Sequence, residues 1–355
     1  MKNLNYSGST LGPHLGEKVS VPAPKRRFLV GTHQIPTALL LIALLSFGGN
    51  MAFGYLSFLR EGIEPQVFST TVDAGTQSGL LGSDDASNAE IPTFALSTHF
   101  VAIDRPAKLN LLAESYLVAD AETGEIILEK NADTAYPMAS VSKLMTAIVA
   151  KEQIDLHHLA TVSDSSYYTY GSEGELSRGE KILVSDLFYP LLIESSNDAA
   201  EVLADDYGRS NFLALLNQKA MSLGMASTHY DDPSGLSPTN VSTAHDLTRL
   251  ALYVRRSYPE LLDVTRVKEY AILDHTWKNE NYFLTYPNFL GGKNGFINEA
   301  RKTTVSYFKV FFRGTDTTSK AVDRPIVIVL LRSADRNKDA ASVLSYVSKN
   351  VRYQP

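Results

Sequence analysis

The longest apolar stretch of the sequence lies close to the amino terminus. No residue from 35 to 59 carries a charge, and a basic cluster at residues 25–27 precedes this run. About 20 apolar residues can cross a bilayer as a helix, and basic residues favour the cytoplasmic side. We therefore predict a cytoplasmic tail in residues 1–27 and a single-pass transmembrane anchor in residues 28–60. A cleaved signal peptide and a buried core helix are the alternatives.

The chain after this run loses its hydrophobic pattern. Residues 61–108 hold scattered Ser, Thr, Gly and Asp. Such a composition is typical of a flexible linker, and we predict one here on the extracytoplasmic side. A short strand near residues 94–101 is an alternative. Regular patterning begins near Leu109, which predicts one folded domain over residues 109–355.

Within that domain the pattern changes from strand to helix and back to strand. Residues 115–120 and 125–129 are β-rich and flank a turn sequence, which predicts a β-hairpin. Two further β-rich runs cover residues 303–312 and 325–331. Helices are predicted from Ser140 onward and at residues 187–193, 199–207, 211–223, 243–255 and 338–350. Strands at both ends with helices between them indicate an α/β domain with a mainly helical insert.

Composition excludes several kinds of chemistry. The 355 residues are 44% hydrophobic and 20% charged, with a formal net charge of -6, which argues against nucleic acid as a main partner. There is no cysteine, which excludes disulfides, thiolate zinc sites and cysteine nucleophiles. We find no zinc-protease, nucleophile-elbow or phosphate-loop motif, and we expect no metal and no cofactor.

A serine and a lysine are spaced as neighbours on one helix face. Ser140 and Lys143 are three residues apart, and apolar residues follow at helical spacing. A serine becomes a strong nucleophile when a neighbouring base removes its proton, and a lysine with a lowered pKa can be that base. A serine cap followed by a surface lysine is the alternative, because so short a pattern recurs by chance.

Two more short patterns follow in a characteristic order. They are Ser195-Ser196-Asn197 and Lys293-Asn294-Gly295. Taken alone, the first is typical of a helix cap and the second of a hairpin turn. Taken together with Ser140-x-x-Lys143, they resemble the penicillin-recognising serine enzymes. The resemblance is greatest to the D-alanyl-D-alanine carboxypeptidases of the low-molecular-mass penicillin-binding proteins (peptidase family S11).

This resemblance covers roughly residues 109–350. It implies a β-lactamase/transpeptidase-like α/β fold with an antiparallel sheet flanked by helices. It also implies an enzyme of the bacterial envelope that acts on peptidoglycan stem peptides and is inhibited by β-lactams. Together with the predicted anchor, this places the domain on the extracytoplasmic face of the bacterial cell membrane.

The resemblance assigns catalytic roles to five residues. Ser140 is implied to form an acyl-enzyme, and Lys143 is the expected base. Ser195 is expected to relay a proton to the leaving amine. Asn197 is expected to bond the substrate amide or to hold Lys143, and Lys293 is expected to orient Ser195 from a facing strand.

A second group of residues is expected to bind substrate. Asn294 stands where the family usually has a threonine that helps bind the terminal carboxylate. Gly295 is expected to let the substrate backbone lie close, and the backbone N–H groups of Ser140 and Phe296 are expected to form an oxyanion hole. Arg336 and Lys338 are both candidates for a second contact with the carboxylate.

The sequence therefore predicts a membrane-anchored D-Ala-D-Ala carboxypeptidase. A D,D-endopeptidase of the same family is one alternative. A non-catalytic peptidoglycan-binding relative is the other, and the change at Asn294 motivates it.

Overall fold

The computed structural model describes residues 99–171, 174–315 and 320–355. The predicted tail, the predicted anchor and most of the predicted linker lie outside these ranges. Within them, no helix combines the length and the apolar character needed to cross a bilayer.

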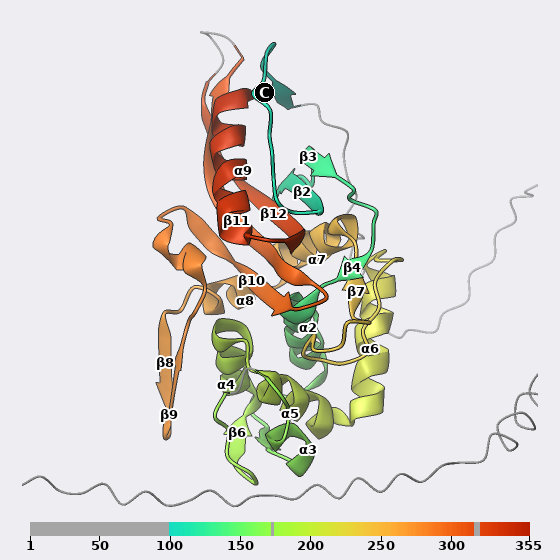
Figure 1. The fold of residues 1–355 in the computed structure, drawn as a ribbon. Coiled ribbons are helices and arrows are strands. Elements are labelled where there is room, and N and C mark those ends of the chain that lie inside the picture. Colours follow the sequence, from blue (N-terminus) through green and yellow to red (C-terminus); the bar gives the residue numbers. More distant parts are fainter. Residues whose placement is uncertain (1–98, 172–173, 316–319) are drawn as a thin grey trace, which may run out of the picture. The chain divides into compact units, whose positions relative to one another are not determined.

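A seven-stranded sheet forms the centre of the domain (Figure 1). Its strands run in the order β1-β13-β11-β12-β2-β3, and β10 pairs with β11 on a separate branch. All of these pairs are antiparallel except the short parallel contact between β11 and β13. The strands are β1 (Phe100–Ala102), β2 (Ser115–Asp120), β3 (Ile126–Lys130), β10 (Phe289–Ile297), β11 (Arg301–Gly314), β12 (Val322–Ser333) and β13 (Val351–Tyr353). The expected fold class is confirmed.

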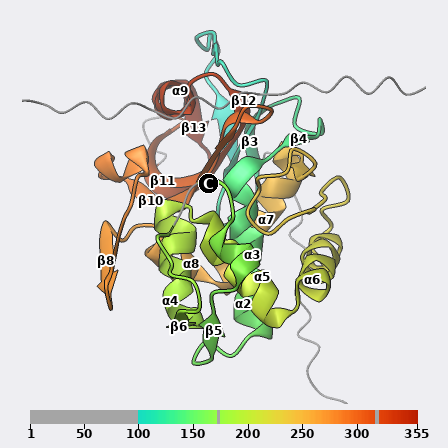
Figure 2. The same ribbon diagram turned by 60° about the horizontal axis from the view of Figure 1, so that its bottom comes forward.

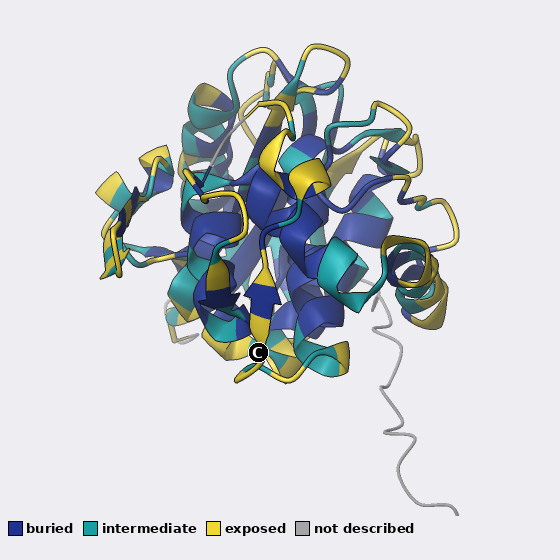
Figure 3. Ribbon diagram, turned by 90° about the horizontal axis from the view of Figure 1, so that it is seen from below, coloured by how far each residue is buried: buried dark blue, intermediate teal, exposed yellow. Residues whose placement is uncertain are grey.

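Helices pack on both faces of this sheet. A large apolar core lies between the sheet and the helical region, and a smaller one lies between the sheet and α9. Buried residues gather at the centre of the domain and exposed ones at its periphery (Figure 3). Helices α2, α4 and α5 gather on one side of β10 (Figures 1 and 2). The helices are α2 (Lys143–Gln153), α3 (Asp164–Tyr167), α4 (Val184–Tyr189), α5 (Asn197–Tyr207), α6 (Arg209–Ser222), α7 (Ala244–Ser257), α8 (Pro259–Val264) and α9 (Arg336–Asn350).

The helices predicted from apolar periodicity are present, with one local change. The segment predicted as one helix over residues 187–193 is α4 followed by the π-helical turn η2 (Pro190–Glu194). The predicted helix at residues 243–255 is α7, and Thr243 caps it by accepting a hydrogen bond from the Asp246 backbone N–H.

The folded domain begins before Leu109. Strand β1 lies in the region predicted as linker, and it pairs with β13 at the end of the chain. Phe100 is buried, and the Glu125 carboxylate accepts the backbone N–H groups of His99 and Phe100. The structure thus supports the alternative of a short strand near residues 94–101, since β1 begins at Phe100 and lies upstream of Leu109.

The Asn294-Gly295 pair does not form a turn. It lies inside β10, opposite Thr304 and Thr303 of β11, and the chain reverses after Ile297. Three two-stranded sheets surround the main sheet and complete the domain. They are formed by β4 (Tyr136–Pro137) with β7 (Val241–Ser242), β5 (Leu159–Thr161) with β6 (Lys181–Leu183), and β8 (Glu269–Ile272) with β9 (His275–Lys278).

Candidate active site

Ser140 and Lys143 lie together where α2 begins. Ser140 belongs to the 3-10 turn η1 (Ala139–Ser142), which continues directly into α2. The Lys143 Nζ lies 3.0 Å from the Ser140 Oγ. Lys143 is completely buried, so the alternative of a surface lysine is wrong.

Two fixed acceptors orient the Lys143 amine. The Nζ donates to the Asn197 Oδ1 and to the Ser234 backbone oxygen, both at 2.7 Å. The Asn197 Nδ2 donates to the Tyr170 carbonyl at 3.0 Å, so the amide oxygen must face the lysine. A neutral amine has two N–H groups and one lone pair. Its N–H groups serve these two oxygens, and the lone pair is left for the Ser140 hydroxyl proton.

The environment of Lys143 favours that neutral form. Burial lowers the pKa of Lys143 to about 7, although the charges of Asp232 and Asp198 act in the opposite direction. Asp232 also shapes the loop that supplies the Ser234 carbonyl, because its carboxylate accepts the backbone N–H groups of Ser234 and Gly235. A base with a pKa near the working pH is effective in proton transfer.

A second buried lysine faces the other serine. Lys293 projects from β10, and its Nζ donates to the Ser195 Oγ at 2.8 Å and to the Asn294 carbonyl at 2.9 Å. Burial, followed by the charges of Lys143 and Arg336, holds the pKa of Lys293 well below its usual value. Ser195 adopts left-handed backbone between η2 and α5, with a φ of 68°. Ser196, rather than Ser195, caps α5.

Two glycines let separate segments approach the turn that carries Ser140 closely. A Cβ on Gly235, whose φ is +84°, would lie 2.1 Å from the Ala139 carbonyl oxygen. A Cβ on Gly295 would lie 2.8 Å from the Ser140 backbone nitrogen. Any side chain at either position would push the loop or β10 away from the turn that carries Ser140.

A pocket of about 220 Å³ opens beside these groups. It brings together Ser140, Ser195 and Lys293 with three of the predicted substrate-binding residues, Asn294, Gly295 and Phe296. Phe296 lines the pocket and is 60% exposed.

The pocket distinguishes between the two candidates on α9. Arg336 lines it, and the Arg336 Nη1 donates to the Gly295 carbonyl at 2.8 Å. Lys338 is exposed and lines a different hollow, with Ala107 and Asn110. Lys338 therefore does not belong to this site.

Sequence reasoning missed three polar residues of the pocket. Glu194 and Glu280 line it, and burial together with neighbouring carboxylates raises the pKa of Glu194 to about 7. Within the described part of the chain, the Glu194 Oε2 is buried without a hydrogen-bond partner. Asn281 is the third. Glu194 could have been found from the sequence, because it directly precedes Ser195. Glu280 and Asn281 lie in a loop that contains no recognisable motif.

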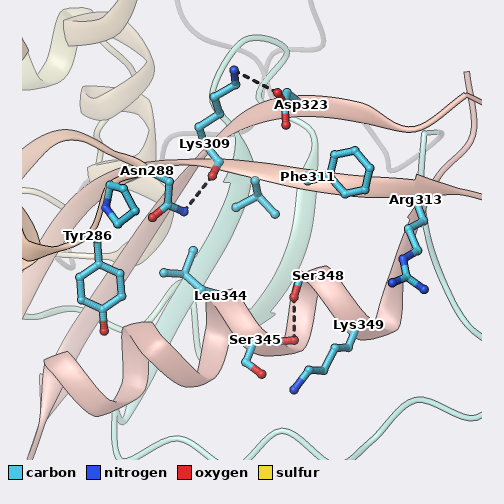
Figure 4. A pocket seen from close by; sticks show the side chains of 12 residues that line it. Tyr286, Asn288, Lys309, Phe311, Arg313, Asp323, Leu344, Ser345, Ser348 and Lys349 are labelled. Carbon is cyan, nitrogen blue, oxygen red and sulfur yellow. Dashed lines mark hydrogen bonds and ion pairs between the residues drawn. The ribbon is translucent and has the colours of Figure 1, made fainter.

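A larger hollow lies elsewhere. Its volume is about 830 Å³, and it is lined by residues of α9, such as Leu344 and Ser345, and of β11, such as Val310 and Phe311 (Figure 4). It shares no lining residue with the pocket at Ser140.

The known proteins most relevant to this site are named as D-alanyl-D-alanine carboxypeptidases or endopeptidases. A family model described as D-alanyl-D-alanine carboxypeptidase, Peptidase S11, matches residues 102–309. The chain is 36% identical over 212 residues to a D-alanyl-D-alanine endopeptidase of Pseudomonas aeruginosa, covering 55% of this chain and 66% of that protein. It is 31% identical over 202 residues to a D-alanyl-D-alanine carboxypeptidase of Mycobacterium tuberculosis, covering 54% of this chain and 69% of that protein. The alignments thus span about two thirds of these relatives.

The similarity extends to solved structures. The crystal structure of a D-alanyl-D-alanine carboxypeptidase from Mycobacterium tuberculosis superposes with a TM-score of 0.60 at 26% identity. The superposition covers 69% of this chain and 95% of that one.

Proposed function

The chain belongs to the D-alanyl-D-alanine carboxypeptidase family, peptidase family S11, and we propose that it is a serine-type D-Ala-D-Ala carboxypeptidase that trims peptidoglycan stem peptides. One observation carries this proposal. The Ser140 hydroxyl lies 3.0 Å from a buried lysine amine whose two other contacts are obligate acceptors. That arrangement suits a nucleophile and its base rather than a structural ion pair.

The first half of the reaction forms an ester on Ser140. Neutral Lys143 removes the hydroxyl proton as the Ser140 Oγ attacks the carbonyl between the two D-alanines. The backbone N–H groups of Ser140 and Phe296 stabilise the oxyanion. The C–N bond breaks as Ser195, oriented by Lys293, passes its proton to the leaving amine and is reprotonated with the proton that Lys143 took from Ser140. D-alanine departs, and Lys143 is neutral again.

The second half returns the free enzyme. Water attacks the ester carbonyl, its proton passes to the Lys143 amine, and the released stem peptide gains a carboxylate while Ser140 regains its proton. A β-lactam presents a strained amide to the same serine, and we expect it to acylate Ser140 and to inhibit the enzyme.

The pocket suits an anionic peptide end. Arg336 places a cationic side chain at its wall, and the Lys293 amine lines the same pocket as a hydrogen-bond donor. Its volume of about 220 Å³ is small compared with typical ligand pockets, which hold about 300–1,000 Å³. A leaving group the size of one alanine suits this space better than a cross-linked second stem.

The direct test is release of D-alanine from a pentapeptide ending in D-Ala-D-Ala, followed by chromatography. We expect release by the full chain and a loss of roughly 10⁴-fold or more in Ser140→Ala. Circular dichroism of the variant controls for folding. A wild-type chain that binds peptidoglycan without releasing D-alanine would instead favour the non-catalytic relative.

D,D-endopeptidase activity is the second candidate, because the Pseudomonas aeruginosa relative carries that name. Digestion of a purified cross-linked muropeptide dimer separates the two. Monomer formation with a kcat/KM equal to that on pentapeptide would favour the endopeptidase, whereas release of terminal D-alanine alone would favour the carboxypeptidase.

Membrane attachment is proposed from the sequence alone. The uncharged run at residues 35–59 supports a single-pass anchor with the amino terminus in the cytoplasm. Fractionation of cells expressing the full chain tests it, with alkaline carbonate extraction of the membranes. Release of the full-length chain by carbonate would contradict an anchor.

A further inference from the structure

The side chain of Asn294 is held from both ends of its amide. It lines the pocket at Ser140 from the strand position next to Lys293. Its Nδ2 donates to the Asn281 Oδ1 at 3.0 Å, and its Oδ1 accepts from the Thr304 Oγ1 at 2.7 Å. Thr304 is the residue directly opposite Asn294 on β11.

A backbone group fixes the direction of this chain of hydrogen bonds. The Phe283 backbone N–H donates to the Asn281 Oδ1 at 3.0 Å. A backbone N–H can only donate, so the Asn281 side-chain atom at this position must be its oxygen. The Asn294 atom that faces the same oxygen must then be the amide nitrogen, because two oxygens of amides would repel each other.

The other end of the amide agrees with that direction. Since the Asn294 oxygen faces Thr304, the Thr304 hydroxyl must donate its only proton to it. The Ser306 hydroxyl lies 2.6 Å from the Thr304 oxygen and can donate to it in turn. Thr304 and Ser306 are completely buried, so water does not compete for these groups.

The amide orientation leaves one N–H of Asn294 without a protein acceptor among the described residues. Arg336 lines the same pocket and is tied to the Gly295 carbonyl, one residue further along β10. An N–H and a guanidinium that share one pocket are suited to the two oxygens of a carboxylate.

We propose that Asn281 and Thr304 are positioning residues that lock the Asn294 amide with an N–H turned toward the terminal carboxylate of the substrate. They act through Asn294 and set the preference for peptides with a free carboxyl end. This inference rests on the proposed peptidase function and deepens it. A substrate whose carboxyl end is an amide, or is joined to another residue, does not offer the same anionic partner.

Two peptides that differ only at the carboxyl end test the proposal. They are a stem pentapeptide ending in D-Ala-D-Ala and its carboxamide, and the readout is the ratio of their kcat/KM values with the full chain. A hydrogen bond to a charged group corresponds to about 10–100-fold in binding. We expect the wild type to prefer the free acid by at least about 10-fold.

Four variants separate positioning from folding. In Asn281→Ala and Thr304→Val the preference for the acid should fall by about 10-fold, mainly through a higher KM for the acid than in the wild type. Thr304→Ser keeps the hydroxyl and should restore the preference. Asn288→Ala is a matched control, because Asn288 is a half-buried asparagine whose amide donates to the Lys309 carbonyl outside the pocket. It should match the wild type.

Each result has one meaning. A wild type that hydrolyses both peptides equally, or an unchanged preference in Asn281→Ala and Thr304→Val, overturns this inference and leaves the proposed function standing. An equal fall in activity on both peptides, not restored by Thr304→Ser, also overturns it, because it reveals a structural role alone. A wild type inactive on both peptides contradicts the proposed function and this inference with it.

Discussion

At the scale of single residues, the partners of a buried amine decide its chemistry. Lys143 contacts two carbonyl-type oxygens and one hydroxyl, so a single lone pair is available and it faces Ser140. The motif spacing predicted the Ser140–Lys143 contact correctly. It did not predict the Ser234 carbonyl, because that contact depends on a loop about ninety positions further along the chain.

The pH dependence of acylation should report on Lys143. Because only the neutral amine can accept the Ser140 proton, and its pKa is lowered to about 7, the rate of acylation by a β-lactam should rise with pH up to about 7 and level off above it. Stopped-flow measurement between pH 5 and 9 checks this. A rate that keeps rising toward the usual lysine pKa of about 10.4 would contradict a lowered pKa.

Glu194 should make stability fall as pH rises. Its pKa is raised from 4.5 to about 7 in the folded chain. Between these values the unfolded chain has lost the proton that the folded chain keeps, so unfolding is favoured as pH rises through this window. Urea unfolding at pH 5 and pH 8 should show a smaller decrease for Glu194→Gln than for the wild type. Equal decreases in the two proteins would show that the pKa of the Glu194 carboxyl is not raised in the folded chain.

At the scale of elements, hydrophobic periodicity predicted helices better than strands. Helices α6, α7 and α9 have apolar residues at helical spacing, so their existence could be read from the sequence. Strand β10 has the sequence FLGGKNGFI, whose glycines and asparagine are typical of turns. These glycines allow close packing: Gly295 lies against the turn that carries Ser140, Gly291 against the end of α8, and Gly292 against β11.

Alanine variants of two glycines with similar backbone conformations distinguish the effect of a steric clash from the effect of backbone strain. Gly235 and Gly179 have φ values of +84° and +76°, but a Cβ on Gly179 would meet nothing within 4 Å. Both alanine variants bear the left-handed backbone penalty of about 1 kcal/mol. Only Gly235→Ala should also displace the Ala139 carbonyl and reduce acylation by about 100-fold or more, by analogy with a small misplacement of a reacting group. Equal acylation rates in the two variants would contradict the close approach.

At the scale of the whole molecule, the two ends of the described chain meet in one sheet. The order of strands could not be predicted from the pattern, because pairing between β1 and β13 joins segments at opposite ends of the domain. Phe100 contributes to this closure, with its ring 5.0 Å from that of Phe312 and 5.4 Å from that of Tyr353.

Replacing Phe100 tests whether strand β1 is an integral part of the folded domain. Phe100→Ala in the full chain should lower the free energy of unfolding by about 3 kcal/mol, as for other buried phenylalanines. Phe311→Ala is the matched control, since Phe311 is 56% exposed on the same sheet. Its effect should stay within about 0.5 kcal/mol. If the two variants were equally stable, β1 would be a dispensable part of the linker.

The central claim is that Ser140 is an acylating nucleophile, and the intact mass of the full chain after incubation with benzylpenicillin tests it most directly. We expect one covalent adduct on the wild type and none on a folded Ser140→Ala variant. An adduct that persists in Ser140→Ala, or no adduct on the wild type at saturating benzylpenicillin, would contradict the claim.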